Sequence, residues 1–185
     1  MPLGRRDSTT ASQSLANGDL PSPASDLATL ISAFGNKGLS PRDLTALSGA
    51  HTIGFSQCQN FRDRIYNDTN IDAAFAALRQ RTYPAAQGSG DSNLAPLDAQ
   101  TPLLFDNAYY RDLMGQRALL YSDQMLTHRG AQDDVVQQYS ADPALFASRL
   151  RRRHGKDGEH HPAHRNRRPD QSQLQGGQQQ LIDCC

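Results

Sequence analysis

The chain has 185 residues, which is enough for one domain with a hydrophobic core, and its 19 basic and 19 acidic residues cancel. A balanced charge gives no reason to expect a polyanion or an anionic membrane surface as a partner. No apolar run is long enough to cross a bilayer, and the N-terminus lacks the apolar region of a signal peptide, so neither feature is expected in these residues.

Residues 26–54 predict two helices. The first follows Asp26 and carries apolar side chains at the spacing of one helix face: Leu27, Leu30, Ile31 and Phe34. The second follows Ser40, a favourable N-cap, and has Pro41 in its first turn. His51 shares the apolar face of this second helix, in the stretch DLTALSGAHTIG over residues 43–54.

Four further helices are predicted downstream. Asp72 caps one helix, Asp106 caps the next, and Asp142 precedes the last. The remaining helix is indicated by apolar residues on one face: Val135, Val136 and Tyr139. Residues 83–102 are rich in Gly, Ser, Asn and Pro and are predicted to be an ordered loop. No strand pattern is strong, so the predicted fold class is all-α.

The composition changes near Ser148, where Arg, His and Gln replace the apolar periodicity. Residues 1–148 are therefore predicted to form the folded domain and residues 149–185 a disordered polar tail. The basic run at 151–156 resembles a nucleic-acid signal, and the histidines and cysteines of the tail could indicate zinc. Irregular ligand spacing and the lack of interleaved aromatic residues argue against both, so no nucleic-acid partner is expected.

A single histidine on an apolar helix face is usually a core residue with satisfied hydrogen bonds. The stretch around His51, however, resembles the proximal haem-ligand motif of plant secretory (class III) haem peroxidases. Further stretches resemble the same family in the same order: residues 4–8 (GRRDS), 20–23 (LPSP), 93–98 (NLAPLD) leading into 101–102 (TP) and 105–110 (FDNAYY), and 120–124 (LYSDQ). Together they cover nearly everything from Met1 to Ser148.

The resemblance implies the proximal half of the peroxidase fold, with haem b and the hydrogen peroxide-dependent oxidation of small phenolic donors. Response to oxidative stress, hydrogen peroxide catabolism, secretion and a monomeric state follow as expectations from the family. His51 would be the axial haem ligand and Asp123 its hydrogen-bond partner, which makes the imidazole electron-rich. Without the resemblance, Asp123 would be interpreted as an ordinary helix cap.

The resemblance also implies a proximal calcium site made of hard oxygen ligands. Its residues would be Thr52, Asp98, Thr101, Asp106 and the carbonyl of Leu104. Without the resemblance, the two aspartates would be loop and cap residues. Two further positions complete the expectations: Pro21 matches a proline that lines the aromatic-substrate channel, and Asn67 begins a glycosylation sequon.

The chain departs from the family in its catalytic residues. No stretch resembles the distal Arg-Leu-x-Phe-His-Asp-Cys motif, whose Arg and His do the acid–base work on peroxide. No catalytic residue is therefore predicted, and turnover is expected to be impaired. The alternative is a non-catalytic peroxidase fragment or an interaction module.

Two other departures concern the cysteine at position 58 and the tail. Tyr83 stands where the family has the disulfide partner of Cys58, so Cys58 is expected to be a free thiol, and losing such a bridge costs about 2–5 kcal/mol. From Ser148 onward, codons read one base later are compatible with the family's C-terminal sequence. Residues 149–185 are accordingly expected to be out of frame.

Overall fold

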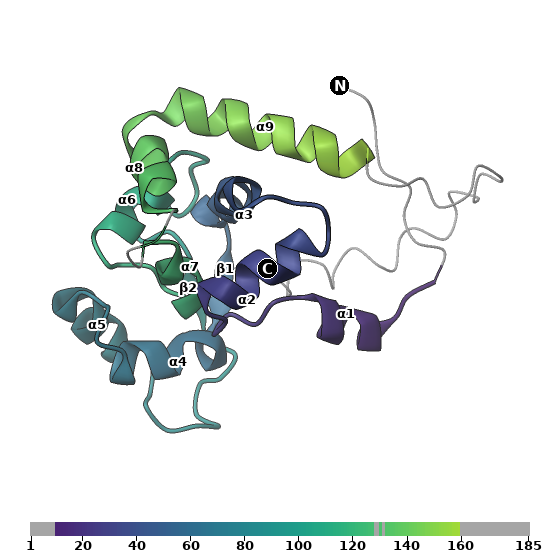
Figure 1. Ribbon diagram of the computed structural model, residues 1–185. Coiled ribbons are helices and arrows are strands. Elements are labelled where there is room, and N and C mark those ends of the chain that lie inside the picture. Colours follow the sequence, from purple (N-terminus) through teal and green to yellow (C-terminus); the bar gives the residue numbers. More distant parts are fainter. Residues whose placement is uncertain (1–9, 128–129, 131, 160–185) are drawn as a thin grey trace.

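The computed structural model describes residues 10–127, 130 and 132–159, with side chains through His154. The described residues form short helices joined by tight turns and one two-stranded ribbon (Figure 1). In chain order the elements are α1 (Gln13–Asp19), α2 (Leu27–Gly35), α3 (Pro41–Ser48), the 3-10 turn η1 (Gly49–Thr52), β1 (Phe55–Gln57), α4 (Cys58–Asn67), α5 (Ala73–Gln80), β2 (Leu94–Pro96), α6 (Ala108–Met114), α7 (Tyr121–Gln124), the 3-10 turn η2 (Met125–Thr127), α8 (Asp133–Ala141) and α9 (Pro143–Glu159).

The helix starts predicted at Asp26, Ser40 and Asp72 are confirmed by their hydrogen bonds. Asp26 accepts from the Thr29 amide and Asp72 from the Phe75 amide, so both cap the helices that follow them. Ser40 and Asp43 form a reciprocal capping box at the start of α3. These caps fix where α2, α3 and α5 begin, and the all-α prediction is confirmed apart from the small ribbon. The N-cap of α6 is Asn107 and not the predicted Asp106, whose Oδ1 accepts from the Ala108 amide.

Two hydrophobic clusters form the core. The larger lies among α2, α3, α6, α8 and α9, and is built around Tyr109, Tyr110, Leu44, Val136 and Phe146. The smaller lies around α4, α5 and β2 and includes Phe61, Ile65 and Tyr83. Figure 1 shows α9 running over α3 and α8 at one end of the molecule, with α4 and α5 at the other.

Three elements differ from the sequence predictions. His51 lies on the 3-10 turn η1 and not on the helix before it, because α3 ends at Ser48. The predicted loop contains β2, which pairs antiparallel with β1 through Ser56 opposite Ala95. Helix α9 continues to Glu159, so residues 149–159 are helical where a disordered tail was expected.

The physical reason for the longer α9 is contact with the core. Leu150 is buried in the larger cluster, and the guanidinium of Arg153 forms an ion pair with the buried Asp43 of α3. Residues 160–185 lie outside the described residues, and with them the rest of the predicted tail. In the part of the chain that the structure describes, no helix is long and apolar enough to span a membrane.

Candidate functional site

The structure brings together the two residues that the sequence placed at the haem. His51 Nδ1 lies 3.0 Å from Asp123 Oδ1 and 3.1 Å from Oδ2. His51 comes from η1 and Asp123 from α7, 72 positions apart in the chain. Helix α3 begins at its capping box and ends at Ser48, and His51 lies one turn later on η1.

A glycine makes the entry to η1 possible. A Cβ on Gly49 would overlap the Tyr110 hydroxyl and lie 2.5 Å from a ring carbon of Phe146. No side chain fits there without movement of these buried rings. The backbone before His51 therefore packs directly on the aromatic core, which holds the histidine against its neighbours.

The hydrogen bond to Asp123 decides the protonation of the ring. Burial opposes the imidazolium, but the charge and hydrogen bond of the Asp123 carboxylate outweigh burial and raise the pKa of His51. A carboxylate accepts only, so Nδ1 carries the shared proton. Among the described residues no group bonds the other ring nitrogen, Nε2, and the His51 side chain is 23% exposed. The neutral ring can thus offer an Nε2 lone pair to a metal.

Tyr109 belongs to this site, although no role in it was predicted from the sequence. Its hydroxyl donates to Asp123 Oδ1 at 2.9 Å, and its ring meets the His51 ring edge-on with centroids 6.1 Å apart. Burial first, and then the Asp123 charge, raise the pKa of Tyr109, so the hydroxyl keeps its proton. The carboxylate accordingly receives hydrogen bonds from two side chains.

Oxygen atoms of the predicted calcium site also converge. Thr52 Oγ1 donates to Asp98 Oδ2 at 3.2 Å, and Thr101 Oγ1 lies 3.4 Å from that same oxygen and 3.2 Å from Asp106 Oδ1. Thr52 and Asp98 are fully buried. Leu104 closes the turn by donating its amide to the Thr101 carbonyl. Two carboxylates and two hydroxyls at one place are a donor set that fits Ca²⁺.

The side chains of this oxygen cluster include only two carboxylates, those of Asp98 and Asp106. Within the described residues no three His, Cys, Asp or Glu side chains gather as a metal site. A cation here would depend on the threonine hydroxyls and on backbone carbonyls as well as on Asp98 and Asp106. Asp112, which the sequence analysis missed, holds the loop in place by accepting from the Ala99 amide and the Gln100 side chain.

The remaining predicted positions lie apart from the His51–Asp123 pair or are tied to it indirectly. Pro21 is half-buried, and two residues later the carbonyl of Pro23 accepts from the Ser122 amide, next to Asp123. Cys58 is buried and has no disulfide partner among the described residues. Tyr83 packs edge-on against Phe61 and donates to the Leu94 carbonyl at 2.9 Å, which secures the loop that a disulfide would secure.

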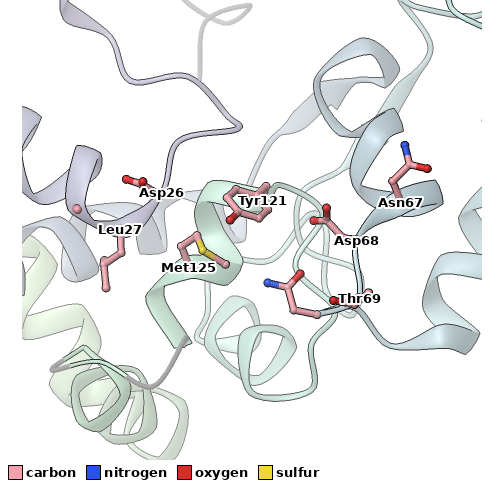
Figure 2. Close-up of a pocket in the computed structure, with 9 residues that line it drawn as sticks. Asp26, Leu27, Asn67, Asp68, Thr69, Tyr121 and Met125 are labelled. Atoms are coloured by element: carbon pink, nitrogen blue, oxygen red, sulfur yellow. The ribbon is translucent and has the colours of Figure 1, made fainter.

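A cleft of about 550 Å³ lies between the start of α2 and the segment after α4 (Figure 2). Asn67, the exposed sequon residue, stands at its rim. Figure 2 shows Tyr121 and Met125, from the segment that also carries Asp123, between Leu27 and Asp68. Neither His51 nor the calcium residues line this cleft, so it is separate from the site described above.

The sequence of the chain is similar to known proteins. A family model described as Peroxidase matches residues 1–142. Peroxidase 22.3 of Oryza sativa subsp. japonica is 61% identical over 146 residues, which are 79% of this chain and 46% of that protein. Peroxidase 70 of Zea mays is 62% identical over 145 residues, 78% of this chain and 45% of that protein. The lignin-forming anionic peroxidase of Nicotiana sylvestris is 55% identical over 147 residues, 79% of this chain and 45% of that protein. The chain spans less than half the length of these curated relatives.

Proposed function

Because this chain belongs to the plant class III peroxidase family, we propose that its described residues form the proximal side of a haem peroxidase site. The observation that carries the proposal is the His51–Asp123 pair, in which the carboxylate holds Nδ1 and no described residue bonds Nε2. His51 would coordinate the iron of haem b through Nε2, and Asp123 would keep the ring oriented and electron-rich. When bound, the haem would supply the chemistry by which hydrogen peroxide oxidises phenolic donors.

Exposed apolar side chains close to His51 in the sequence fit this proposal. Ile53 and Phe55 follow the histidine, and Leu94 lies on the strand paired with that of Phe55. They are 46%, 46% and 58% exposed, respectively. A macrocycle, or a further part of the enzyme, would remove such surface from water, at about 25 cal/mol for each Å².

Calcium is the second ligand we propose. Asp98, Asp106, Thr52 and Thr101 would bind it through side-chain oxygens, with the carbonyl of Leu104. Thr52 directly follows His51 on η1, so an ion at this place would restrain the turn that carries the histidine. The ion would thus hold the ligand histidine in position and take no part in the chemistry.

The family further suggests a secreted monomer that acts in hydrogen peroxide catabolism and in the response to oxidative stress, with Pro21 near the path of phenolic donors and Asn67 glycosylated. Residues 1–185 contain no match to the distal Arg and His motif, so we expect their turnover of peroxide to be low. The exposed apolar residues also favour a second candidate function, an interaction module without catalysis. Cooperative unfolding of the haem-free chain would support that candidate.

The test is hemin titration of residues 1–185 with Ca²⁺, followed by absorption in the Soret region and by phenol oxidation. We expect a histidine-ligated spectrum that His51→Ala abolishes and that His154→Ala, at an exposed position on α9, leaves intact. An unchanged spectrum in His51→Ala would refute the axial role. Efficient phenol oxidation that depends on His51 would refute the expectation of low turnover.

A further inference from the structure

Two side-chain donors meet at the carboxylate of Asp123, and His51 Nδ1 lies within reach of both oxygens, 3.1 Å from Oδ2. Asp123 Oδ1 accepts from His51 Nδ1 at 3.0 Å and from the Tyr109 hydroxyl at 2.9 Å. Asp123 is only 4% exposed, so water satisfies little of its charge and these donors must do so. The two hydrogen bonds draw on the negative charge of the same carboxylate, so each weakens the attraction of the carboxylate for the proton of the other donor.

Packing holds Tyr109 in the position from which its hydroxyl competes with His51 for the Asp123 carboxylate. It is 2% exposed on α6, and its ring packs edge-on against both the His51 ring and Tyr110, at centroid distances of 6.1 Å and 5.1 Å. Tyr110 is anchored separately, because its hydroxyl donates 2.9 Å to the Thr45 carbonyl of α3. Helix α6 therefore reaches α7 through Tyr109 and α3 through Tyr110.

We propose that Tyr109 is a positioning residue that sets the strength of the Asp123–His51 hydrogen bond and the rotation of the His51 ring. The effect of Tyr109 on the haem iron rests on the proposed function. A weaker hydrogen bond at Nδ1 would make Nε2 a less electron-rich ligand to the iron. Tyr109 would then hold the ligand at an intermediate donor strength. Removal of its hydroxyl would leave the carboxylate to His51 alone.

The first test needs no haem. In the haem-free chain labelled with ¹⁵N-histidine, the Nδ1–H proton of His51 reports the strength of its hydrogen bond. Tyr109→Phe should move this resonance downfield, and Tyr110→Phe, the matched loss of a buried hydroxyl on the same helix, should leave it in place. Equal shifts in the two variants, no shift, or an upfield shift in Tyr109→Phe would overturn the proposal.

A nearly isosteric variant keeps the proposal testable if Tyr109→Phe does not fold. With 3-fluorotyrosine at position 109 the hydroxyl is a stronger donor, so the same resonance should move upfield, opposite to Tyr109→Phe. A downfield shift or no shift with a folded fluorinated chain would contradict the inference. Circular dichroism of each variant establishes that the chain is folded.

The second test uses the hemin-loaded, reduced chain. Resonance Raman spectra should show a higher iron–histidine stretching frequency in Tyr109→Phe than in the wild type, and no change in Tyr110→Phe. A frequency that stays the same in Tyr109→Phe would overturn the link to the iron. A chain that binds no hemin would refute the proposed function instead, and the haem-free resonance would still decide the role of Tyr109.

Discussion

At the scale of single residues, the site is a chain of hydrogen bonds that runs from α6 to η1. Tyr109 donates to Asp123, and Asp123 accepts from His51, whose second nitrogen faces away from these partners. Each contact joins residues far apart in sequence. The properties of His51 therefore depend on side chains that its own helix does not supply.

The raised pKa of His51 predicts how stability depends on pH. Burial disfavours the imidazolium, but Asp123 outweighs burial and raises the pKa above that of the unfolded chain, about 6.5. The pair thus stabilises the haem-free fold fully below pH of about 6.5 and loses this contribution as pH rises through the raised value. Urea unfolding across pH should show this loss in the wild type. The pH-dependent loss of stability should disappear in Asp123→Asn. A loss of equal size in that variant would contradict the assignment of the pH dependence to the His51–Asp123 pair.

Gly49→Ala should destabilise the chain, because its Cβ would overlap the Tyr110 hydroxyl and crowd the Phe146 ring. We expect a cost of about 1–3 kcal/mol in the free energy of unfolding. Gly35→Ala is the matched control: it lies in α2 with open space around the new Cβ, so the substitution should be neutral or stabilising. Denaturant midpoints measure both, and a neutral Gly49→Ala would show that η1 is not closely packed.

At the scale of elements, α9 supports the helix that leads to His51. It packs on α3 and α8, buries Leu150 and pairs Arg153 with Asp43. Asp43 also accepts from the Ser40 amide, so one carboxylate joins the start of α3 to α9. The family model ends at residue 142, so this support comes from residues beyond the match.

Arg153→Ala should therefore destabilise the chain more than Arg152→Ala. The first leaves Asp43 buried without its cation, at a cost of about 1–3 kcal/mol, whereas Arg152 is exposed and its loss should cost little. Thermal unfolding of the two variants gives the comparison. Equal stabilities would indicate that the ion pair adds nothing and that residues 149–159 are dispensable for α3.

Helix starts were the part of the fold that the sequence could predict. Ser40, Asp72 and Asp142 act through hydrogen bonds to amides three positions away, which a local pattern reveals. The pairing of β1 with β2 and the extension of α9 depend on distant contacts, such as that of Arg153 with Asp43. No window of the sequence contains both partners, so these elements were not predicted.

At the scale of the whole molecule, two kinds of site meet at η1. His51 is hydrogen-bonded to Asp123, and the next residue, Thr52, is hydrogen-bonded to Asp98. The proposed haem and calcium ligands would therefore share one turn of backbone. Both sets of residues were predicted from the sequence resemblance. It could not identify Tyr109 and Asp112, because their roles are defined by which oxygen or amide they meet in space.

Calcium should raise the thermal midpoint of the chain in proportion to the logarithm of its concentration above the dissociation constant. Asp98→Asn and Asp106→Asn remove a charged ligand each and should abolish the increase. Asp134→Asn changes an exposed aspartate on α8 and should retain it. Calorimetry with Ca²⁺ and with Mg²⁺ measures the effect, and an increase that survives both ligand substitutions would place the ion elsewhere.

The central claim is that Nε2 of His51 is the protein's bond to haem iron, and imidazole rescue tests it most directly. His51→Gly, loaded with hemin, should lack the histidine-ligated absorption spectrum, and added imidazole should restore it because the small ring can occupy the vacated place beside Asp123. Rescue should fail when Asp123→Ala is added to the variant. A His51→Gly chain that keeps the wild-type spectrum without imidazole would contradict the account, since another residue would then be the ligand.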